Sequence, residues 1–129
     1  MKVKPFMRPR YQRLLEKVER DFEAVKILEL LGLSSPAAFH IQHGLEKLFK
    51  VCIGESGSRP PVTHDLVEFW AMAGQHLDFE INATFLEFLN QFAVDAWYDI
   101  DATPQQAKLA LEEALKIREA LAAWFEARA

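Results

Sequence analysis

Apolar residues recur every three to four positions along most of the chain, which is the pattern of amphipathic α-helices. This pattern predicts helices over residues 9–31, 35–53, 63–77, 84–97 and from residue 103 onward. No stretch of the sequence alternates between apolar and polar residues as a strand would. We therefore expect an all-α protein, an antiparallel up-and-down bundle of four to five helices, with residues 1–129 in one domain.

The predicted helix over residues 35–53 is apolar around most of its circumference. Ser35 and Pro36 form a start signal, as a capping residue followed by a proline in the first turn. Two apolar strips follow, formed by Ala38, Ile41, Leu45, Leu48 and Cys52 and by Phe39, Phe49 and Ile53. A helix of this kind belongs in the middle of a bundle, so we expect it to be the central element.

The ends of the other helices carry their own signals. Gly32 is placed to end the first helix in a left-handed turn, and Thr63 to cap the third. Thr103 and Gln106 have the spacing of a capping box. Residues 54–62, GESGSRPPV, read as a loop because they consist mainly of glycine, serine and proline.

Composition and charge narrow the class of protein. The net charge is −4 and the estimated pI is 5.6, which excludes a domain that holds nucleic acid through overall positive charge but allows a local basic patch. Cys52 is the single cysteine, so no disulfide framework can form, and no apolar run is long enough for a membrane span. We expect a cytoplasmic protein without a membrane segment. The basic start of the chain, with Arg8 and Arg10, can contact an anionic partner, but a solvated tail is the favoured interpretation.

A cationic stripe follows the predicted central helix. His40, His43, Lys47 and Lys50 fall within an arc of roughly 80° on a helix that turns about 100° per residue. Two ammonium groups and two titratable imidazoles on one face favour a phosphate group. The same stripe is also compatible with a solvated helix face.

His64 and Asp65 stand where the third helix begins, directly after the loop. A helix N-terminus presents backbone N–H groups that can bind an anion. The alternative is that the two side chains only cap the helix. Both interpretations stay open at the level of sequence.

Several signatures of enzymes and metal sites are missing. The sequence contains no glycine-rich phosphate loop, no CxxC, no HExxH and no GxSxG. His40 and His43 could share a metal, with Glu46 three residues further on, but no acidic or cysteine pattern completes such a site. We therefore predict no metal, no cofactor and no catalytic residue.

Two blocks of sequence resemble a known family. The first is Ala38-Phe39-His40-x-Gln42 followed by Glu46-Lys47-Leu48-x-Lys50, and the second is Thr63-His64-Asp65-Leu66 after a proline loop. In this order and spacing the blocks resemble the HEPN domain family, small helical domains of bacteria, archaea and some eukaryotes. The resemblance implies a homodimer, an association with nucleotides or RNA, and a nucleotidyltransferase partner protein, as in prokaryotic toxin–antitoxin pairs.

The chain departs from the ribonucleases of that family. Those relatives carry an arginine, four to six residues and a histidine near the start of the last long helix. Here no arginine lies between Arg59 and Arg118, and no histidine follows His76. Arg59 and His64 do have four residues between them, but they flank the proline loop, and we interpret this spacing as coincidental.

The leading hypothesis is a non-catalytic HEPN-like module that binds a nucleotide or nucleic acid. In it, Asp65 orients His64 or contacts the ligand, and two further residues line the cleft from the end of the fourth helix. The proposed ligand-binding residues are His40, His43, Lys47, Lys50, His64, Asp65, Asp95 and Tyr98.

Two alternatives remain. One is a metal-independent ribonuclease toxin that uses His40, His64 and Arg59. The other is a helical interaction protein without a small ligand, in which His40 and Gln42 are buried hydrogen-bonding groups.

Overall fold

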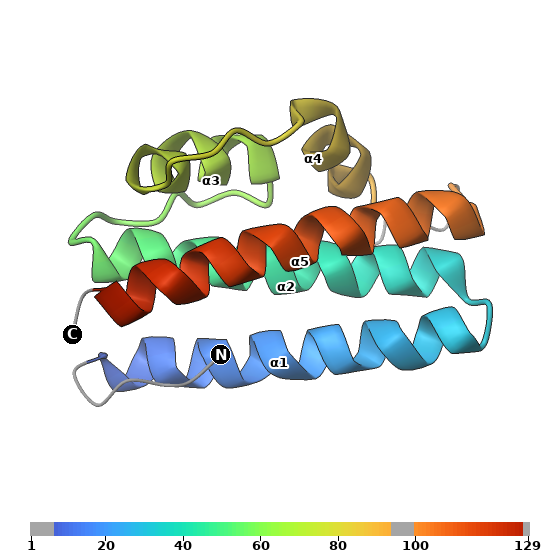
Figure 1. Ribbon diagram of the computed structural model, residues 1–129, viewed down its shortest axis with the longest axis horizontal. Coiled ribbons are helices and arrows are strands. Elements are labelled where there is room, and N and C mark those ends of the chain that lie inside the picture. The colour runs from blue at the N-terminus through green and yellow to red at the C-terminus, as the bar shows by residue number, and fades with distance from the viewer. Residues whose placement is uncertain (1–6, 94–99, 128–129) are drawn as a thin grey trace.

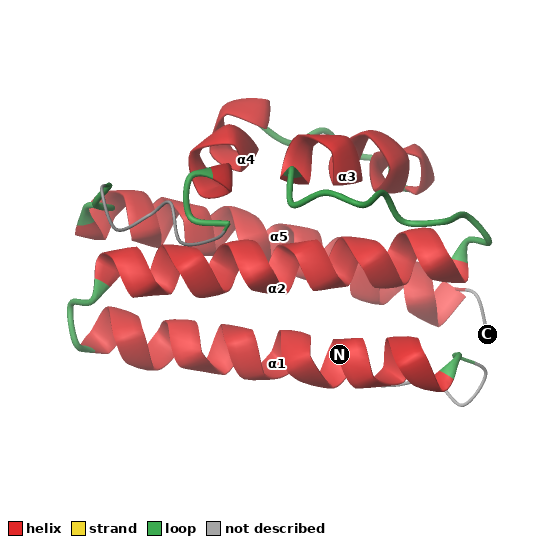
Figure 2. Ribbon diagram, turned by 180° about the vertical axis from the view of Figure 1, so that it is seen from behind, coloured by secondary structure: helices red, strands yellow, loops and turns green. Residues whose placement is uncertain are grey.

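The computed structural model describes residues 7–93 and 100–127, and these residues form a bundle of α-helices without any strand (Figures 1 and 2). The all-α prediction is thereby confirmed. Five α-helices and one short 3₁₀ turn, Gly74–His76, follow one another. The α-helices are α1 (Pro9–Leu30), α2 (Ser34–Glu55), α3 (Leu66–Ala73), α4 (Ala83–Asn90) and α5 (Pro104–Ala127).

Helix α2 is the central element, as its apolar circumference predicts. Figure 1 shows α1 on one side of it, the short α3 and α4 on the other, and α5 alongside. Ile41, Leu45, Leu48 and Phe49 are fully buried. The helices around α2 shield these side chains from water. Burial of apolar surface is the main source of stability in such a bundle.

The long helices do not alternate strictly in direction. α1 and α2 are antiparallel because the chain turns within residues 31–33, whereas α5 runs in the same direction as α2 (Figure 1). α3 and α4, with eight residues each, occupy the place of a long return helix. α1 and α2 have 22 residues each, so the start of α1 lies level with the end of α2.

Glycines end both helices of this hairpin. Gly32 has φ +71°, as its position predicted, and Gly57 has φ +94°. Ser58 N donates to the carbonyl of Ile53 at 3.1 Å and Gly57 N to that of Gly54 at 3.1 Å. These two hydrogen bonds satisfy the last carbonyls of α2 and reverse the chain, and the following loop runs back along α2 on the side of α3 (Figure 1).

The predicted start signals hold for α5 but not for α2 and α3. Thr103 and Gln106 form the capping box, with reciprocal hydrogen bonds of 2.9 and 3.1 Å. Ser35 does not cap α2, which begins one residue earlier, and its hydroxyl instead accepts a hydrogen bond from the backbone N–H of Ala102 at 2.9 Å. Thr63 does not cap α3, because Asp65 does.

The short helices are shorter than the periodicity suggested. α3 ends at Ala73, where the chain tightens into the 3₁₀ turn, and α4 ends at Asn90. Val62, in the loop before α3, is fully exposed. Along α5, Phe125 rather than Trp124 completes the buried seam.

Candidate functional site

The predicted cationic stripe on α2 is divided between two carboxylates. His40 Nδ1 lies 2.9 Å from Asp21 Oδ1, and Lys47 Nζ lies 2.6 Å from Asp21 Oδ2. The Asp21 side chain is 12% exposed, while those of His40 and Lys47 are 34% and 23% exposed. The first half of the stripe therefore neutralises a largely buried acid on α1 and ties the two helices together.

His43, which lies between His40 and Lys47 on α2, has a different partner. Its Nε2 donates to the carbonyl oxygen of Ala93 at 3.0 Å, and its ring lies against that of Phe39, with 4.2 Å between the centroids. Burial lowers the pKa of His43, and the nearby Lys47 lowers it further, although the hydrogen bond to Ala93 acts in the opposite direction. A neutral His43 thus joins α2 to the end of α4.

The second half of the stripe surrounds Glu46. Lys50 Nζ lies 3.1 Å from Glu46 Oε2, and His64 Nδ1 lies 2.8 Å from Glu46 Oε1. Gln42, which is fully buried, donates to the backbone carbonyl of His64 at 3.2 Å. Burial raises the pKa of Glu46, but the hydrogen bonds from His64 and Lys50 outweigh burial and leave that pKa below its ordinary value.

Asp65 has a structural role at this point of the chain. Its Oδ1 accepts hydrogen bonds from Val67 N at 2.9 Å and from Asn90 Nδ2 at 2.7 Å. Asp65 thus caps α3 and joins it to the end of α4. The expectation that Asp65 orients His64 is corrected: the carboxylate that contacts the His64 ring belongs to Glu46. The two other predicted ligand residues, Asp95 and Tyr98, lie outside the described residues.

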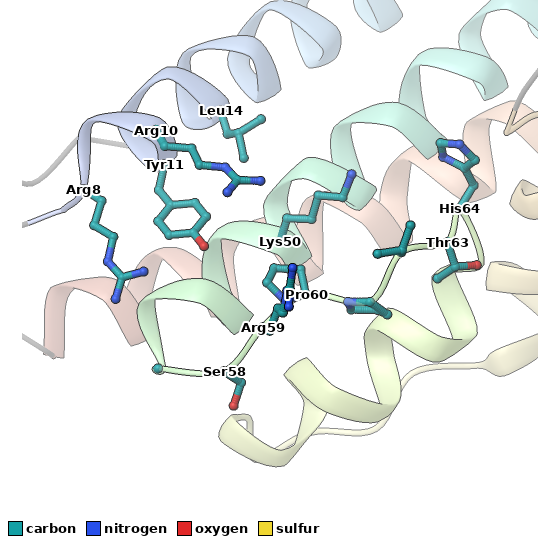
Figure 3. A pocket seen from close by; sticks show the side chains of 13 residues that line it. Arg8, Arg10, Tyr11, Leu14, Lys50, Ser58, Arg59, Pro60, Thr63 and His64 are labelled. Atoms are coloured by element: carbon teal, nitrogen blue, oxygen red, sulfur yellow. The ribbon is translucent and has the colours of Figure 1, made fainter.

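Lys50 and His64 border a cleft of about 630 Å³ between the start of α1 and the loop that follows α2. Figure 3 shows this cleft from close by, with α1 on one side and the loop on the other. Arginines from two segments join the two predicted residues: Arg8 and Arg10 from the beginning of α1, and Arg59 from the loop. Four permanent cations and one imidazole thus surround one cavity.

The two arginines of α1 are positioned by Tyr11. The guanidinium carbons of Arg8 and Arg10 each lie 5.9 Å from the centroid of its ring, which is the distance of a cation–π contact. Tyr11 itself is 4% exposed and forms part of the wall of the cleft. The backbone N–H of Arg8 donates to Glu55 Oε1 at 3.2 Å, which fixes the start of α1 against the end of α2.

Arg59 reaches the cleft because the chain reverses at Gly57 and then stiffens. Pro60 and Pro61 follow it directly, and proline restricts the backbone of the loop. The described residues contain no group of three or more histidines, cysteines, aspartates or glutamates able to hold a metal ion. What the arrangement can do is attract and hold an anion.

The three arginines are missing from the ligand residues of the leading sequence hypothesis. The sequence favours a solvated tail for Arg8 and Arg10, and it gives Arg59 a role only in the alternative ribonuclease. The structure places all of them at the same cleft. A signal was available, since an antiparallel hairpin of two helices of similar length brings the residues before the first helix next to those after the second.

Comparison with known proteins agrees with this fold. The profile of the HEPN domain matches residues 11–127. The chain belongs to the HEPN family. The crystal structure of TT1696 from Thermus thermophilus superposes on this HEPN domain with a TM-score of 0.71 and 19% sequence identity, over 91% of this chain and 99% of that one. That likeness concerns the fold. No curated protein matches the chain.

The described helices were also compared with the length and apolar character of a membrane-spanning segment. Within residues 7–93 and 100–127, no helix combines the length and the apolar character needed to cross a bilayer.

Proposed function

We propose that this HEPN domain is a non-catalytic module that binds a phosphate-bearing ligand, a nucleotide or RNA. The ligand binds in the cleft lined by Arg8, Arg10 and Arg59, which we call the arginine cleft. A single observation carries the proposal: Arg8, Arg10, Lys50, Arg59 and His64 meet at one cavity in a chain whose net charge is −4. Such a local excess of positive charge favours a polyanion, and guanidinium groups bind phosphate oxygens through two parallel hydrogen bonds.

Three of the other ligand residues predicted from sequence have partners elsewhere. His40 and Lys47 are held by Asp21, and His43 by Ala93. The binding module we propose therefore keeps Lys50 and His64 from the original set and adds the three arginines.

Two further parts of the proposal rest on family membership. HEPN domains commonly form dimers, and we propose a homodimer that acts with a nucleotidyltransferase partner in a toxin–antitoxin-like pair. Light scattering during gel filtration tests the dimer, with an expected mass twice the 14.8 kDa of one chain. A mass of one chain over the whole micromolar range would refute it. Copurification with a nucleotidyltransferase encoded beside the gene tests the partner.

The binding experiment compares two triple variants with equal loss of charge. Arg8→Ala, Arg10→Ala and Arg59→Ala empty the cleft, whereas Arg20→Ala, Lys26→Ala and Lys116→Ala remove three exposed cations elsewhere. Fluorescence anisotropy with a labelled nucleoside triphosphate and a labelled single-stranded RNA measures the affinity. We expect the first variant to lose at least about 30-fold, as phosphate contacts are removed, and the second to lose about twofold. Equal losses would refute a cleft-specific site.

A second candidate function is a metal-independent ribonuclease, and one observation favours it. Arg59 and His64 line the same cleft, and Glu46 holds Nδ1 of His64, which leaves Nε2 for a substrate. In such a reaction the imidazole takes the proton of an RNA 2′-hydroxyl, whose oxygen attacks the adjacent phosphorus. The 5′-oxygen leaves with a proton from a water molecule, and Arg59 stabilises the charge on the phosphorus oxygens.

This candidate is tested by incubation of RNA with the purified protein in excess EDTA. Cleavage that is lost in His64→Ala and kept in His76→Ala would establish it, because His76 is an exposed histidine on the 3₁₀ turn. If the wild-type protein leaves RNA intact, both alone and with its partner, the ribonuclease is refuted and the non-catalytic binding module remains as the proposed function.

A further inference from the structure

The walls of the arginine cleft are rich in groups that bind phosphate and poor in side chains that recognise a ribose or the edges of most bases. Among the described residues that line it, none has a carboxylate or carboxamide side chain. Asparagine and glutamine recognise the edge of adenine, carboxylates accept hydrogen bonds from cytosine, and a carboxylate commonly holds a ribose hydroxyl, whereas arginine and lysine pair with guanine as well as with phosphate. The cleft offers mainly guanidinium, ammonium and imidazole donors instead.

The phenol ring of the cleft is too buried to stack a base, which leaves the imidazole of His64 as the exposed ring among the described lining residues. Tyr11 is 4% exposed, and the guanidinium groups of Arg8 and Arg10 already lie at its ring. Proteins that hold single-stranded nucleic acid through its bases present exposed aromatic faces for stacking. The remaining wall consists of glycine, of apolar residues such as Leu14, Pro60 and Val62, and of two residues with a hydroxyl group, Ser58 and Thr63.

The cations are arranged around the cavity rather than along a line. Arg8 and Arg10 approach from α1, Lys50 from α2 and Arg59 from the loop, as Figure 3 shows. Glu46 already pairs with Lys50 and His64, so the three arginines supply most of the uncompensated charge. Within the described residues no carboxylate forms an ion pair with the side chains of these arginines. A ligand with several closely spaced phosphates matches this geometry best.

We infer that the site recognises closely spaced phosphate groups alone, irrespective of the base that carries them and without a metal ion. This inference rests on the proposed function and specifies its ligand. Two sources share the chemistry, the phosphate chain of a free nucleotide and the phosphates of an RNA, and the experiment separates them.

Isothermal titration of the wild-type protein in EDTA provides the test, with inorganic triphosphate, ATP, GTP, CTP, UTP and adenosine as probes. We expect the five phosphate compounds to bind within about threefold of one another and adenosine not to bind, because a base edge read by hydrogen bonds would add about tenfold or more. Arg59→Ala should weaken all five by a similar factor. A tenfold preference for one base, or nucleotides that bind while inorganic triphosphate does not, would overturn the inference and leave the proposed function intact.

Competition with short RNAs identifies the source of the phosphates. Oligo(A), oligo(C) and oligo(U) with a 5′-hydroxyl compete equally if the backbone is bound, whereas only 5′-triphosphate forms compete if a phosphate chain is bound. Either result supports recognition of phosphate alone, and competition by one base sequence only contradicts it. If no probe of any kind binds, the proposed function itself fails.

Discussion

Tyr11 lies on the backbone of Gly54, so closely that a Cβ atom at residue 54 would come within 2.1 Å of Cζ and Oη of the tyrosine. The contact joins the first turn of α1 to the last turn of α2. It also sets the place of the ring against which Arg8 and Arg10 lie. A glycine inside a helix normally costs stability, and here its small size is what allows the wall of the cleft to form.

Gly54→Ala is expected to destabilise the protein by about 1–3 kcal/mol, because overpacking outweighs the helix propensity gained. Gly44→Ala is the matched control on the same helix, since a Cβ there would meet the edge of Phe22 at 3.2 Å. Urea denaturation measures both. Equal effects of the two alanines would show that the contact with Tyr11 is not decisive.

The same contact predicts a non-additive pair. Tyr11→Leu removes the ring with which the new Cβ collides, so Gly54→Ala should cost less in the Tyr11→Leu background than in the wild type. Both single variants should also bind inorganic triphosphate several-fold more weakly, because Arg8 and Arg10 lose the ring at which they are held. Additive losses of stability in the double variant would contradict this account.

Asp21→Asn is expected to lower the free energy of unfolding by about 1–2 kcal/mol. The substitution leaves His40 and Lys47 without their shared carboxylate, but both side chains are partly exposed and regain some hydration. Urea unfolding at neutral pH measures the effect, with the exposed Glu23→Gln of the same helix as the control. Triphosphate affinity should stay unchanged, because Asp21 does not line the cleft. A large loss of triphosphate affinity in Asp21→Asn would instead indicate that His40 and Lys47 belong to the binding site.

Glu46 makes the free energy of unfolding depend on pH in the acidic range. Its pKa in the folded protein lies below the ordinary value of 4.5, so its stabilising contribution is complete above pH 4.5 and is lost as the pH falls through the folded pKa. Glu46→Gln should be less stable than the wild type at pH 7, and the difference should shrink below about pH 4.5. Unfolding free energies from pH 7 to 3 measure this, and a difference that grows in acid would refute the assignment.

His43 affects stability at a higher pH. Burial lowers its pKa in the folded state, whereas in the unfolded chain it takes up a proton near pH 6.5, so the unfolded state gains as the pH drops below that value. The stability of the wild type should therefore fall relative to His43→Gln between pH 7.5 and about 5.5. His76→Gln serves as the exposed control. The same relative change in that control would contradict the role of His43.

Much of the fold was predictable from local signals. The apolar circumference of residues 35–53 identified the central helix, and Gly32 and the capping box of Thr103 and Gln106 marked helix ends that the structure confirms. These signals depend on residues within one or two turns of each other. Where a capping residue also has a distant partner, the prediction failed: Asp65 rather than Thr63 caps α3, in a network with Asn90 on another helix.

The candidate site, too, was predictable only where it depends on residues close together in sequence. Helical periodicity by itself placed His40, His43, Lys47 and Lys50 on one face. The two sequence blocks resemble the HEPN family, and the match over residues 11–127 shows that the chain belongs to it. Tertiary structure alone decided which of these cations have acidic partners and which border a cleft. Asp21 and Glu46 neutralise most of the stripe, and Arg8, Arg10 and Arg59 meet because α1 and α2 are equal in length and antiparallel. Spacing along one helix fixes directions around its axis, but the energy of a charge depends on neighbours that only folding brings near.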